Sequence, residues 1–247
     1  NPNRNSSLNI TDCLFDKCCA MIHGGAIFAL VSHYFIESSC FKYCWARDKQ
    51  VASLRSESNL LHSINFTTIY MNGKQPYMKS DEDCIPKNSI LTTFSSFAPL
   101  IVVANINNTK NTVTDNCAGH YIISSYMAYL KYSTFSDNSG EKILHISLKN
   151  NSSIDHINLI NNSAYLKYKG LIFCSAKTTF EDFIFIKNMH PLVCTSRYGN
   201  VNLINCLFDF PENQITKIDN DNKETDNKNL DIGFEGNVSY QKCVFDN

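Results

Sequence analysis

The amino-acid sequence predicts an all-β protein, a parallel β-solenoid of about nine coils of 22–26 residues each. Three observations predict it. A pattern centred on a large apolar residue recurs along the chain, and the apolar residues show no helical spacing. Charged residues make up only 18% of the chain, and Asn, Ser and Thr, which favour turns and strands over helix interiors, take their place.

The repeat is anchored on one residue, with apolar residues two and five positions before it. Neighbouring anchors are separated by 26, 25, 22, 24, 26 and 23 residues. The 47 residues between the third and fourth anchors are interpreted as two spacings, with a blurred repeat near Phe94. The predicted anchors are Phe15, Phe41, Phe66, Val113, Phe135, Leu159, Phe185, Phe208 and Phe245.

Each coil is expected to hold three short strands. The residues seven and five positions before the anchor share one strand face, and the residue two before the anchor shares a face with the anchor itself. The odd offset between these pairs requires a bend between the first two strands. The third strands are predicted within residues 26–30, 50–54, 99–106, 120–126, 142–148, 170–176 and 191–196.

A column of asparagines is predicted at the bend three residues after the anchor. Because the bend leaves backbone groups unpaired, an inward Asn can bond to that backbone and to the Asn of the next coil. The predicted members are Asn116, Asn138, Asn162 and Asn188. Cys18 and Cys44 take this position in the first two coils, and Pro211 takes it beside Phe208. Gly24 and Gly25 follow the first bend, where a turn with positive φ or a close approach favours glycine.

These motifs resemble a known family of surface proteins. The segments 135–138 (FSDN), 185–188 (FIKN), 159–162 (LINN) and 24–27 (GGAI) resemble the repeats of the chlamydial polymorphic outer-membrane proteins (Pmp). The segments around Cys13 and Cys40 resemble the cysteine-enriched variant found in trichomonad surface proteins. The resemblance implies a right-handed parallel β-helix at a cell surface, with a role in adhesion or surface architecture and no catalytic residues.

The whole chain, 1–247, is interpreted as one β-helix domain. Two polar segments, 71–88 and 211–235, interrupt the repeat and are predicted loops. Coil boundaries in 67–112 stay undefined in the sequence. Because the last residues end in mid-coil, we expect a part of a longer solenoid or an end-to-end assembly, with other protein chains or further β-helix coils as partners.

The charge balance excludes some partners. With 22 Lys and Arg against 23 Asp and Glu, the net charge of −1 offers no basic surface for nucleic acid or for an anionic membrane. No apolar stretch is long enough to span a bilayer. No motif indicates a metal or a cofactor, because the 11 cysteines contain no Cys-x-x-Cys pair. A host or surface glycan or protein ligand is the expected further partner.

Sequons and cysteines bear on location. Glycosylation of Asn-x-Ser/Thr sequons would place the chain outside the cell. The candidates are Asn5, Asn9, Asn65, Asn107, Asn150, Asn151, Asn161 and Asn237. The cysteine pairs predicted to share a column are Cys18 with Cys44, Cys206 with Cys243, and Cys174 with Cys194. Neighbouring parallel coils put such pairs within disulfide range, and stacked reduced thiols are the alternative.

Three functions stay open. The leading prediction is a non-catalytic structural or adhesive segment of an extracellular cell-surface or filament protein. A carbohydrate-active β-helix enzyme, either a polysaccharide lyase or a hydrolase, is the first alternative. It would use Asp155, Glu181 and Asp182, because the register sets Asp155 beside Glu181 and His156 beside Asp182. Asp115 and Asp137 form a second predicted pair. An intracellular β-solenoid scaffold with free thiols and bare sequons is the third possibility.

Overall fold

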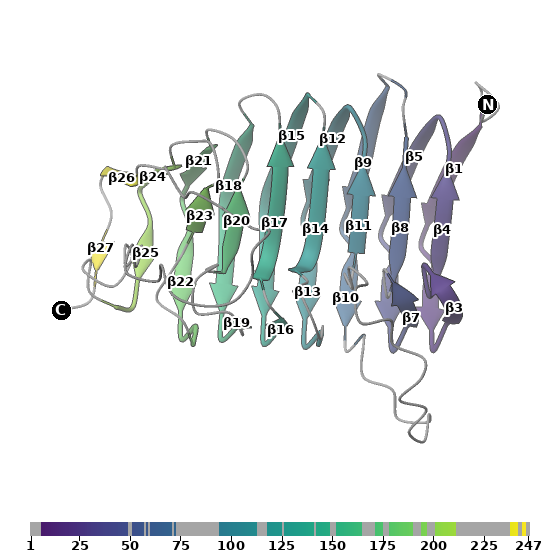
Figure 1. The fold of residues 1–247 in the computed structure, drawn as a ribbon, viewed down its shortest axis with the longest axis horizontal. Coiled ribbons are helices and arrows are strands. Elements are labelled where there is room, and N and C mark those ends of the chain that lie inside the picture. Colours follow the sequence, from purple (N-terminus) through teal and green to yellow (C-terminus); the bar gives the residue numbers. More distant parts are fainter. Residues whose placement is uncertain are drawn as a thin grey trace, which may run out of the picture.

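The computed structural model describes residues 6–48, 51–56, 58, 60–70, 72, 94–112, 118–124, 126–140, 142–148, 152–164, 171–174, 178–189, 194–196, 201–210, 238–241 and 244–245. Within these residues the regular secondary structure is all β-strand. The strands pair in parallel and stack as a β-solenoid, so the predicted class is confirmed. Figure 1 shows the stack from the side, with the N-terminal strands at one end and the C-terminal strands at the other.

The first ladder of strands runs through the whole stack. Its members are β1 (Ser7–Thr11), β5 (His33–Glu37), β9 (Leu61–Asn65), β12 (Leu100–Ala104), β15 (Met127–Ser136), β18 (Ser153–Ile160), β21 (Thr178–Glu181), β24 (Val201–Ile204) and β26 (Val238–Gln241). Because the strands pair in register, equivalent side chains of successive turns form columns. Successive residues within a column are about 4.8 Å apart.

The second ladder carries the anchor residues. Its members are β2 (Leu14–Asp16), β6 (Cys40–Lys42), β10 (Thr68–Tyr70), β13 (Asn107–Thr109), β22 (Ile184–Ile186), β25 (Leu207–Phe208) and β27 (Val244–Phe245). The long strands β15 and β18 belong to both ladders, which therefore form one 16-stranded sheet.

The third ladder is a separate seven-stranded sheet. It consists of β4 (Ile27–Leu30), β8 (Ala52–Arg55), β11 (Phe94–Phe97), β14 (Ala118–Ser124), β17 (Lys142–Leu148), β20 (Ile172–Cys174) and β23 (Cys194–Ser196). Two short pairs lie between the second and third ladders, namely β3 (Cys19–His23) with β7 (Trp45–Asp48) and β16 (Ser139–Gly140) with β19 (Ser163–Ala164).

Two columns of residues with positive φ turn the chain in each coil. The first corner lies three residues before the anchor and holds Asp12, Ser38, Phe66, Asn105, Tyr132, His156, Asp182 and Asn205. The second corner lies two residues after the anchor and holds Lys17, Tyr43, Lys110, Asp137, Asn161 and Lys187. A left-handed residue reverses the side-chain alternation of a strand, which explains the odd offset seen in the sequence. Several corner N–H groups donate to a carbonyl of the next turn, as Asp182 does to Ile204 at 3.0 Å.

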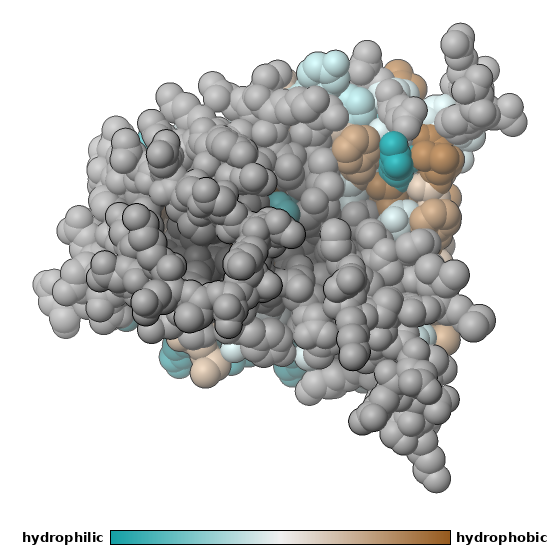
Figure 2. All heavy atoms as spheres, viewed as in Figure 1, coloured by the Kyte–Doolittle hydropathy of each residue, from teal (hydrophilic) through white to brown (hydrophobic). Residues whose placement is uncertain are grey.

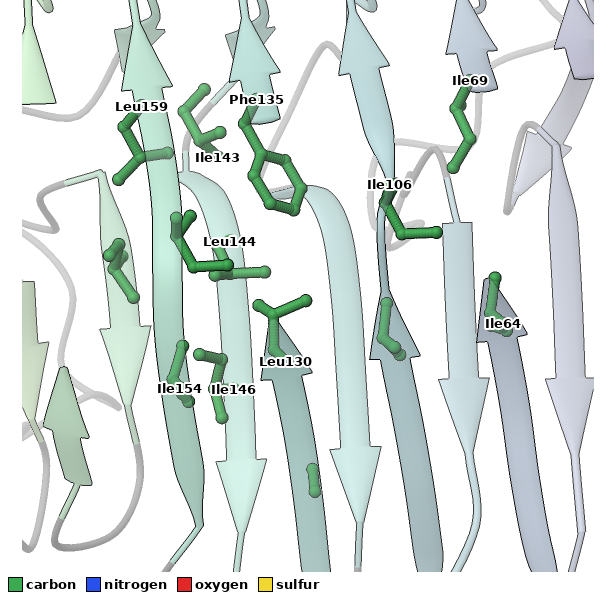
Figure 3. Packing of buried hydrophobic residues seen from close by; sticks show 14 of the residues in the cluster. Ile64, Ile69, Ile106, Leu130, Phe135, Ile143, Leu144, Ile146, Ile154 and Leu159 are labelled. Carbon is green, nitrogen blue, oxygen red and sulfur yellow. The ribbon is translucent and has the colours of Figure 1, made fainter. Parts of the chain in front are cut away.

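The apolar core fills the space between the ladders. Leu130 and Ile154 of the first ladder point inward toward Leu144 and Ile146 of the third, and Phe135 closes the core at the second (Figure 3). These side chains are at most 2% exposed. Equivalent rings also stack along the anchor column. Phe15 lies on Phe41, and Phe185 lies on Phe208, each with ring centroids 4.7 Å apart.

The predicted anchors Phe66 and Val113 are wrong. Ile69 pairs with Phe41, and Asn108 pairs with both Ile69 and Phe135, so Ile69 and Asn108 are the anchors of these turns. Phe66 is a first-corner residue, 58% exposed. The error arose because one turn contains a long insertion and another buries an asparagine where the sequence search required an apolar residue.

The third strand predicted within 99–106 is also wrong. Residues Leu100–Ala104 form β12, which pairs with β9 and β15 in the first ladder. The third-ladder strand of that turn is β11, Phe94–Phe97, where the sequence showed only a blurred repeat. Both segments are short apolar runs, and periodicity alone does not tell which ladder such a run joins. The other predicted third strands overlap the third ladder.

Of the two glycines after the first bend, Gly24 has the backbone conformation that favours glycine. Its φ is +58°, and a Cβ added there would lie 2.1 Å from the carbonyl oxygen of Ile27. A non-glycine residue at this position therefore meets both backbone strain and a backbone clash. Of the two predicted loops, 211–235 lies wholly outside the described residues, and Asn72 is the one described residue of 71–88.

Candidate functional site

A column of buried asparagines runs along the second corner, and it is structural. The backbone N–H of Asn138 donates to Oδ1 of Asn162 at 3.1 Å, and that of Asn162 donates to Oδ1 of Asn188 at 2.9 Å. Each amide Nδ2 also donates backward, to the carbonyl of the anchor one turn earlier. Asn138 reaches Asn108 in this way, and Asn162 reaches Phe135, both at 2.8 Å.

The column continues toward the N-terminus through two asparagines that the sequence prediction missed. The N–H of Asn72 donates to Oδ1 of Asn111, and the N–H of Asn111 donates to Oδ1 of Asn138. Asn116, predicted for this place, lies outside the described residues, and Asn111 occupies the position before Asn138. The missed signal is the spacing Asn108-x-x-Asn111, which repeats the anchor-to-bend interval with a polar anchor.

Cys44 replaces asparagine in the turn before Asn72. Its N–H donates to Oδ1 of Asn72 at 2.7 Å, so it continues the column. Its thiol lies 3.6 Å from the carbonyl oxygen of Phe15, the acceptor that an Asn would reach with Nδ2. Burial raises the pKa of the Cys44 thiol to about 12, and the neighbouring Cys18 contributes further interactions.

The predicted disulfides are not present in the described residues. Cys18 and Cys44 are free thiols, and Cys243, the predicted partner of Cys206, lies outside the described residues. Their sulfurs face backbone carbonyls instead, as the Cys206 thiol does at 3.4 Å from Ile204. This matches the alternative of stacked reduced thiols for Cys18 and Cys44.

The pair Cys174 and Cys194 does not share a column. Cys174 pairs with Ser196, and Cys194 pairs with Ile172, so the two cysteines are offset by two residues along neighbouring strands. The sequence pattern placed them together because apolar third strands look alike when shifted by two residues.

The described sequons occupy different positions on the surface. Asn9, Asn107 and Asn161 are exposed, whereas Asn65 is half-buried and its Oδ1 accepts from Asn105 at 2.9 Å. The Asn161 amide donates to Asp137 at 2.6 Å. Asn5, Asn150, Asn151 and Asn237 lie outside the described residues.

A groove on the lateral surface, with more apolar than polar lining, is the candidate binding site. It is open, encloses about 650 Å3, and crosses successive turns beside the first corner. Its walls include Tyr132, His156, Asn158, Asp182, Asn205 and Leu207. Since every described turn has a left-handed residue at this corner, that conformation belongs to the fold and only the side chains distinguish the groove.

His156 stands between two carboxylates at one side of the groove. Its Nδ1 lies 3.1 Å from Oδ1 of Asp155, and its Nε2 lies 3.4 Å from Oδ2 of Asp182. Asp182 also accepts a hydrogen bond from the amide of Asn205. The ring of His156 lies against Tyr132, with centroids 4.7 Å apart and an interplanar angle of 42°.

Asp155 is the buried member of this cluster. Its side chain is 10% exposed, and Oδ2 lies 3.0 Å from Nζ of Lys131 and accepts from Ser153 at 2.9 Å. Burial alone would raise the pKa of Asp155, but hydrogen bonds from Lys131, Ser153 and His156 outweigh it and lower that pKa. The same contact raises the pKa of Lys131.

The residues of the predicted enzyme alternative are only partly brought together. Asp155 pairs in register with Glu181, and His156 contacts Asp182, as the sequence register indicated. Glu181 is exposed on its strand. Asp115 lies outside the described residues, and the residue equivalent to Asp137 in the preceding turn is Lys110, so the predicted pair of Asp115 and Asp137 does not follow the register.

A second surface feature is an apolar patch near the N-terminal end. Phe28 and Leu30 point outward from β4 and are 65% and 49% exposed. Arg55 pairs with Leu30 in the next strand and lies over the ring of Phe97 at 5.4 Å. Figure 2 shows brown apolar side chains beside a teal one at this end of the molecule.

Two further observations concern the described residues as a set. No group of three or more His, Cys, Asp or Glu side chains there is arranged to hold a metal ion. No helix there has the length and hydrophobicity needed to cross a bilayer.

The fold and its side-chain columns define the class of the chain, a parallel β-solenoid repeat protein. Comparisons with models of protein families, with curated proteins and with solved structures found no match to this chain. The site therefore has to be interpreted from its own geometry.

Proposed function

We propose that the chain is a non-catalytic structural and adhesive segment of an extracellular cell-surface or filament protein. In this proposal it is a right-handed β-helix of nine coils, one domain over 1–247. The in-register series of anchors from Phe15 to Phe245 supports nine coils. The resemblance to the Pmp-like repeats supports the handedness and the surface role, and further coils or other chains are its partners.

The observation that carries the proposal is the continuous Asn column. It commits asparagine side chains of five successive turns, four of them buried and Asn188 half-buried, to backbone hydrogen bonds, so these residues serve the stack and not a reaction. A rigid rod assembled this way presents columns of outward side chains at a fixed spacing. Such a surface suits display and lateral contact.

The test of the surface role is the intact mass of the protein from its native source. Surface display predicts a mass decrease on glycosidase treatment, at sequons such as the exposed Asn107 and Asn161. Bare sequons together with eleven alkylatable thiols would contradict it and would favour the intracellular scaffold instead.

One observation favours a second candidate, a carbohydrate-active enzyme. Asp155, His156 and Asp182 form a connected acid–base cluster at the groove. A glycosidase needs a carboxylic acid that holds its proton, with a raised pKa, whereas the pKa of Asp155 is lowered. Turnover of a polysaccharide panel that disappears in Asp182→Ala would establish the enzyme. No turnover with intact folding would leave the structural role.

A further inference from the structure

The groove beside the first corner is elongated along the solenoid axis. Tyr132, His156, Asp182 and Asn205 are equivalent residues of four successive turns, because their flanking residues pair in register. A ligand that contacts all four therefore lies across the strands and parallel to the stack. This geometry suits an extended chain better than a compact molecule.

Within the described residues, the strands that form the floor of the groove have no free edge. Strand β18 is paired with β15 on one side and with β21 and β22 on the other, and β22 is also paired with β25. A peptide therefore has no backbone ladder to join there, and recognition has to use side chains. This argues against an extended peptide as the occupant.

The groove combines apolar surface from Phe183, Ile184 and Leu207 with one open aromatic ring and with uncharged and acidic hydrogen-bonding groups. Tyr132 is 57% exposed, and His156 packs against it on one side. Asp182, Asn158 and Asn205 supply carboxylate and amide groups farther along the groove. Among the described residues no lysine or arginine lines the groove, and the nearby Lys131 is paired with Asp155. A polyanion would therefore meet the carboxylate of Asp182 without an unpaired lysine or arginine to balance its charge.

We propose that this groove binds a neutral, linear glycan along the solenoid axis. The C–H face of one sugar ring packs on Tyr132, and the hydroxyl groups of the following rings bond to Asp182, Asn158 and Asn205. The inference rests on the proposed adhesive function and supplies its ligand class, because an adhesive rod requires a site at which a surface polymer is held.

The test uses the full chain and isothermal titration calorimetry with defined neutral oligosaccharides, namely β-1,4-glucose, β-1,3-glucose, β-1,4-mannose and N-acetylglucosamine oligomers. We expect one of these series to bind with affinity that increases with chain length. We expect Tyr132→Ala to weaken that binding about tenfold or more. A weaker loss is expected in Asp182→Asn.

Phe66→Ala is the matched control. Phe66 occupies the same first-corner position in another turn, has a positive φ, and is 58% exposed, but it does not line the groove. It should keep full binding, and circular dichroism should show both variants folded. Absence of binding to every neutral series, tighter binding of an acidic oligosaccharide, or an equal loss in Phe66→Ala would each overturn the proposal.

The outcome is separable from that of the proposed function. The glycosidase mass shift reports surface location without reference to the groove. A shifted mass with no glycan binding would refute the groove inference alone. A bare, fully reduced chain would refute the surface role even if the groove binds sugar in solution.

Discussion

The N-terminal and central turns of the solenoid satisfy the backbone groups at the second corner with different side chains. In the central turns, Asn138 and its neighbours bond both forward and backward with distances of 2.8–3.2 Å. In the N-terminal turns, Cys44 keeps the forward contact through its backbone but reaches the preceding carbonyl only with a thiol, at 3.6 Å. A thiol is a weak donor and no useful acceptor, so the cysteine end is held less strongly per turn. The comparison teaches that the column requires a small inward residue, while its strength depends on the amide.

The largest predicted effect is in the central turns. Asn138→Ala should lower the free energy of unfolding by about 2–4 kcal/mol, because it removes the hydrogen bond to the carbonyl of Asn108 and the buried acceptor of the Asn111 N–H. Chemical denaturation followed by circular dichroism measures it. Asn107→Ala is the control, since Asn107 is exposed in the adjacent strand. Equal losses in the two variants would refute the structural role of the column.

The next effect belongs to the cysteine end. Gly24→Ala should lower the free energy of unfolding by about 2 kcal/mol or more, because its φ of +58° and the carbonyl of Ile27 both oppose a side chain. The control is Phe28→Ser, which changes an outward residue to the one that Ser53 supplies in the next strand. A stability of Gly24→Ala equal to that of the control would show that the first bend relaxes freely.

The direct test of the comparison is Cys44→Ala. We expect a loss of about 1 kcal/mol, smaller than that of Asn138→Ala, because only weak thiol contacts disappear and the backbone contact to Asn72 remains. The burial of the Cys44 thiol is tested separately, by measuring the rates of cysteine alkylation at pH 8 with mass spectrometry. Cys44, with its pKa raised to about 12, should react far more slowly than the exposed Cys13 and Cys19. Equal alkylation rates would contradict the burial of Cys44.

The smallest effect is a pH dependence at the boundary between the two regions. His62 is fully buried; its Nδ1 accepts from the N–H of Tyr34 at 3.2 Å, and its Nε2 has no partner among the described residues. Burial lowers the pKa of His62. The unfolded chain therefore takes up a proton at higher pH than the folded chain, and stability decreases as pH falls below about 6.5.

The slope of this decrease is at most about 1.4 kcal/mol per pH unit for one proton. His62→Gln keeps an acceptor for Tyr34 and removes the titration, so it should flatten the stability profile between pH 6.5 and 5. A wild-type profile that is flat in this interval would show that His62 does not stay neutral in the folded chain.

Some of the structure was predictable because it repeats. In the turns of Phe135, Leu159, Phe185 and Phe208, the corner before the anchor keeps the same distance in sequence from that anchor. The four predicted anchors all lie in one ladder. From residue 66 to 113 the prediction was wrong, because an insertion shifts the interval and Asn108 replaces an apolar anchor. The sequence prediction named His156 and Asp182 of the groove but not Tyr132 or Asn205. The register placed His156 beside Asp182, and the same offset from the anchors Phe135 and Phe208 places Tyr132 and Asn205 in that column. The spacing did not indicate that these four side chains line a groove.

The sequence by itself determined the class of fold and the inward columns, because a repeated interval forces equivalent residues of stacked turns onto the same face. Only the tertiary structure decided which apolar run joined which ladder, whether cysteines in a column stayed as thiols, and how the charges at Asp155 were paired. Those outcomes depend on contacts between residues more than twenty positions apart, such as Lys131 with Asp155. Such contacts leave no local signal in the chain.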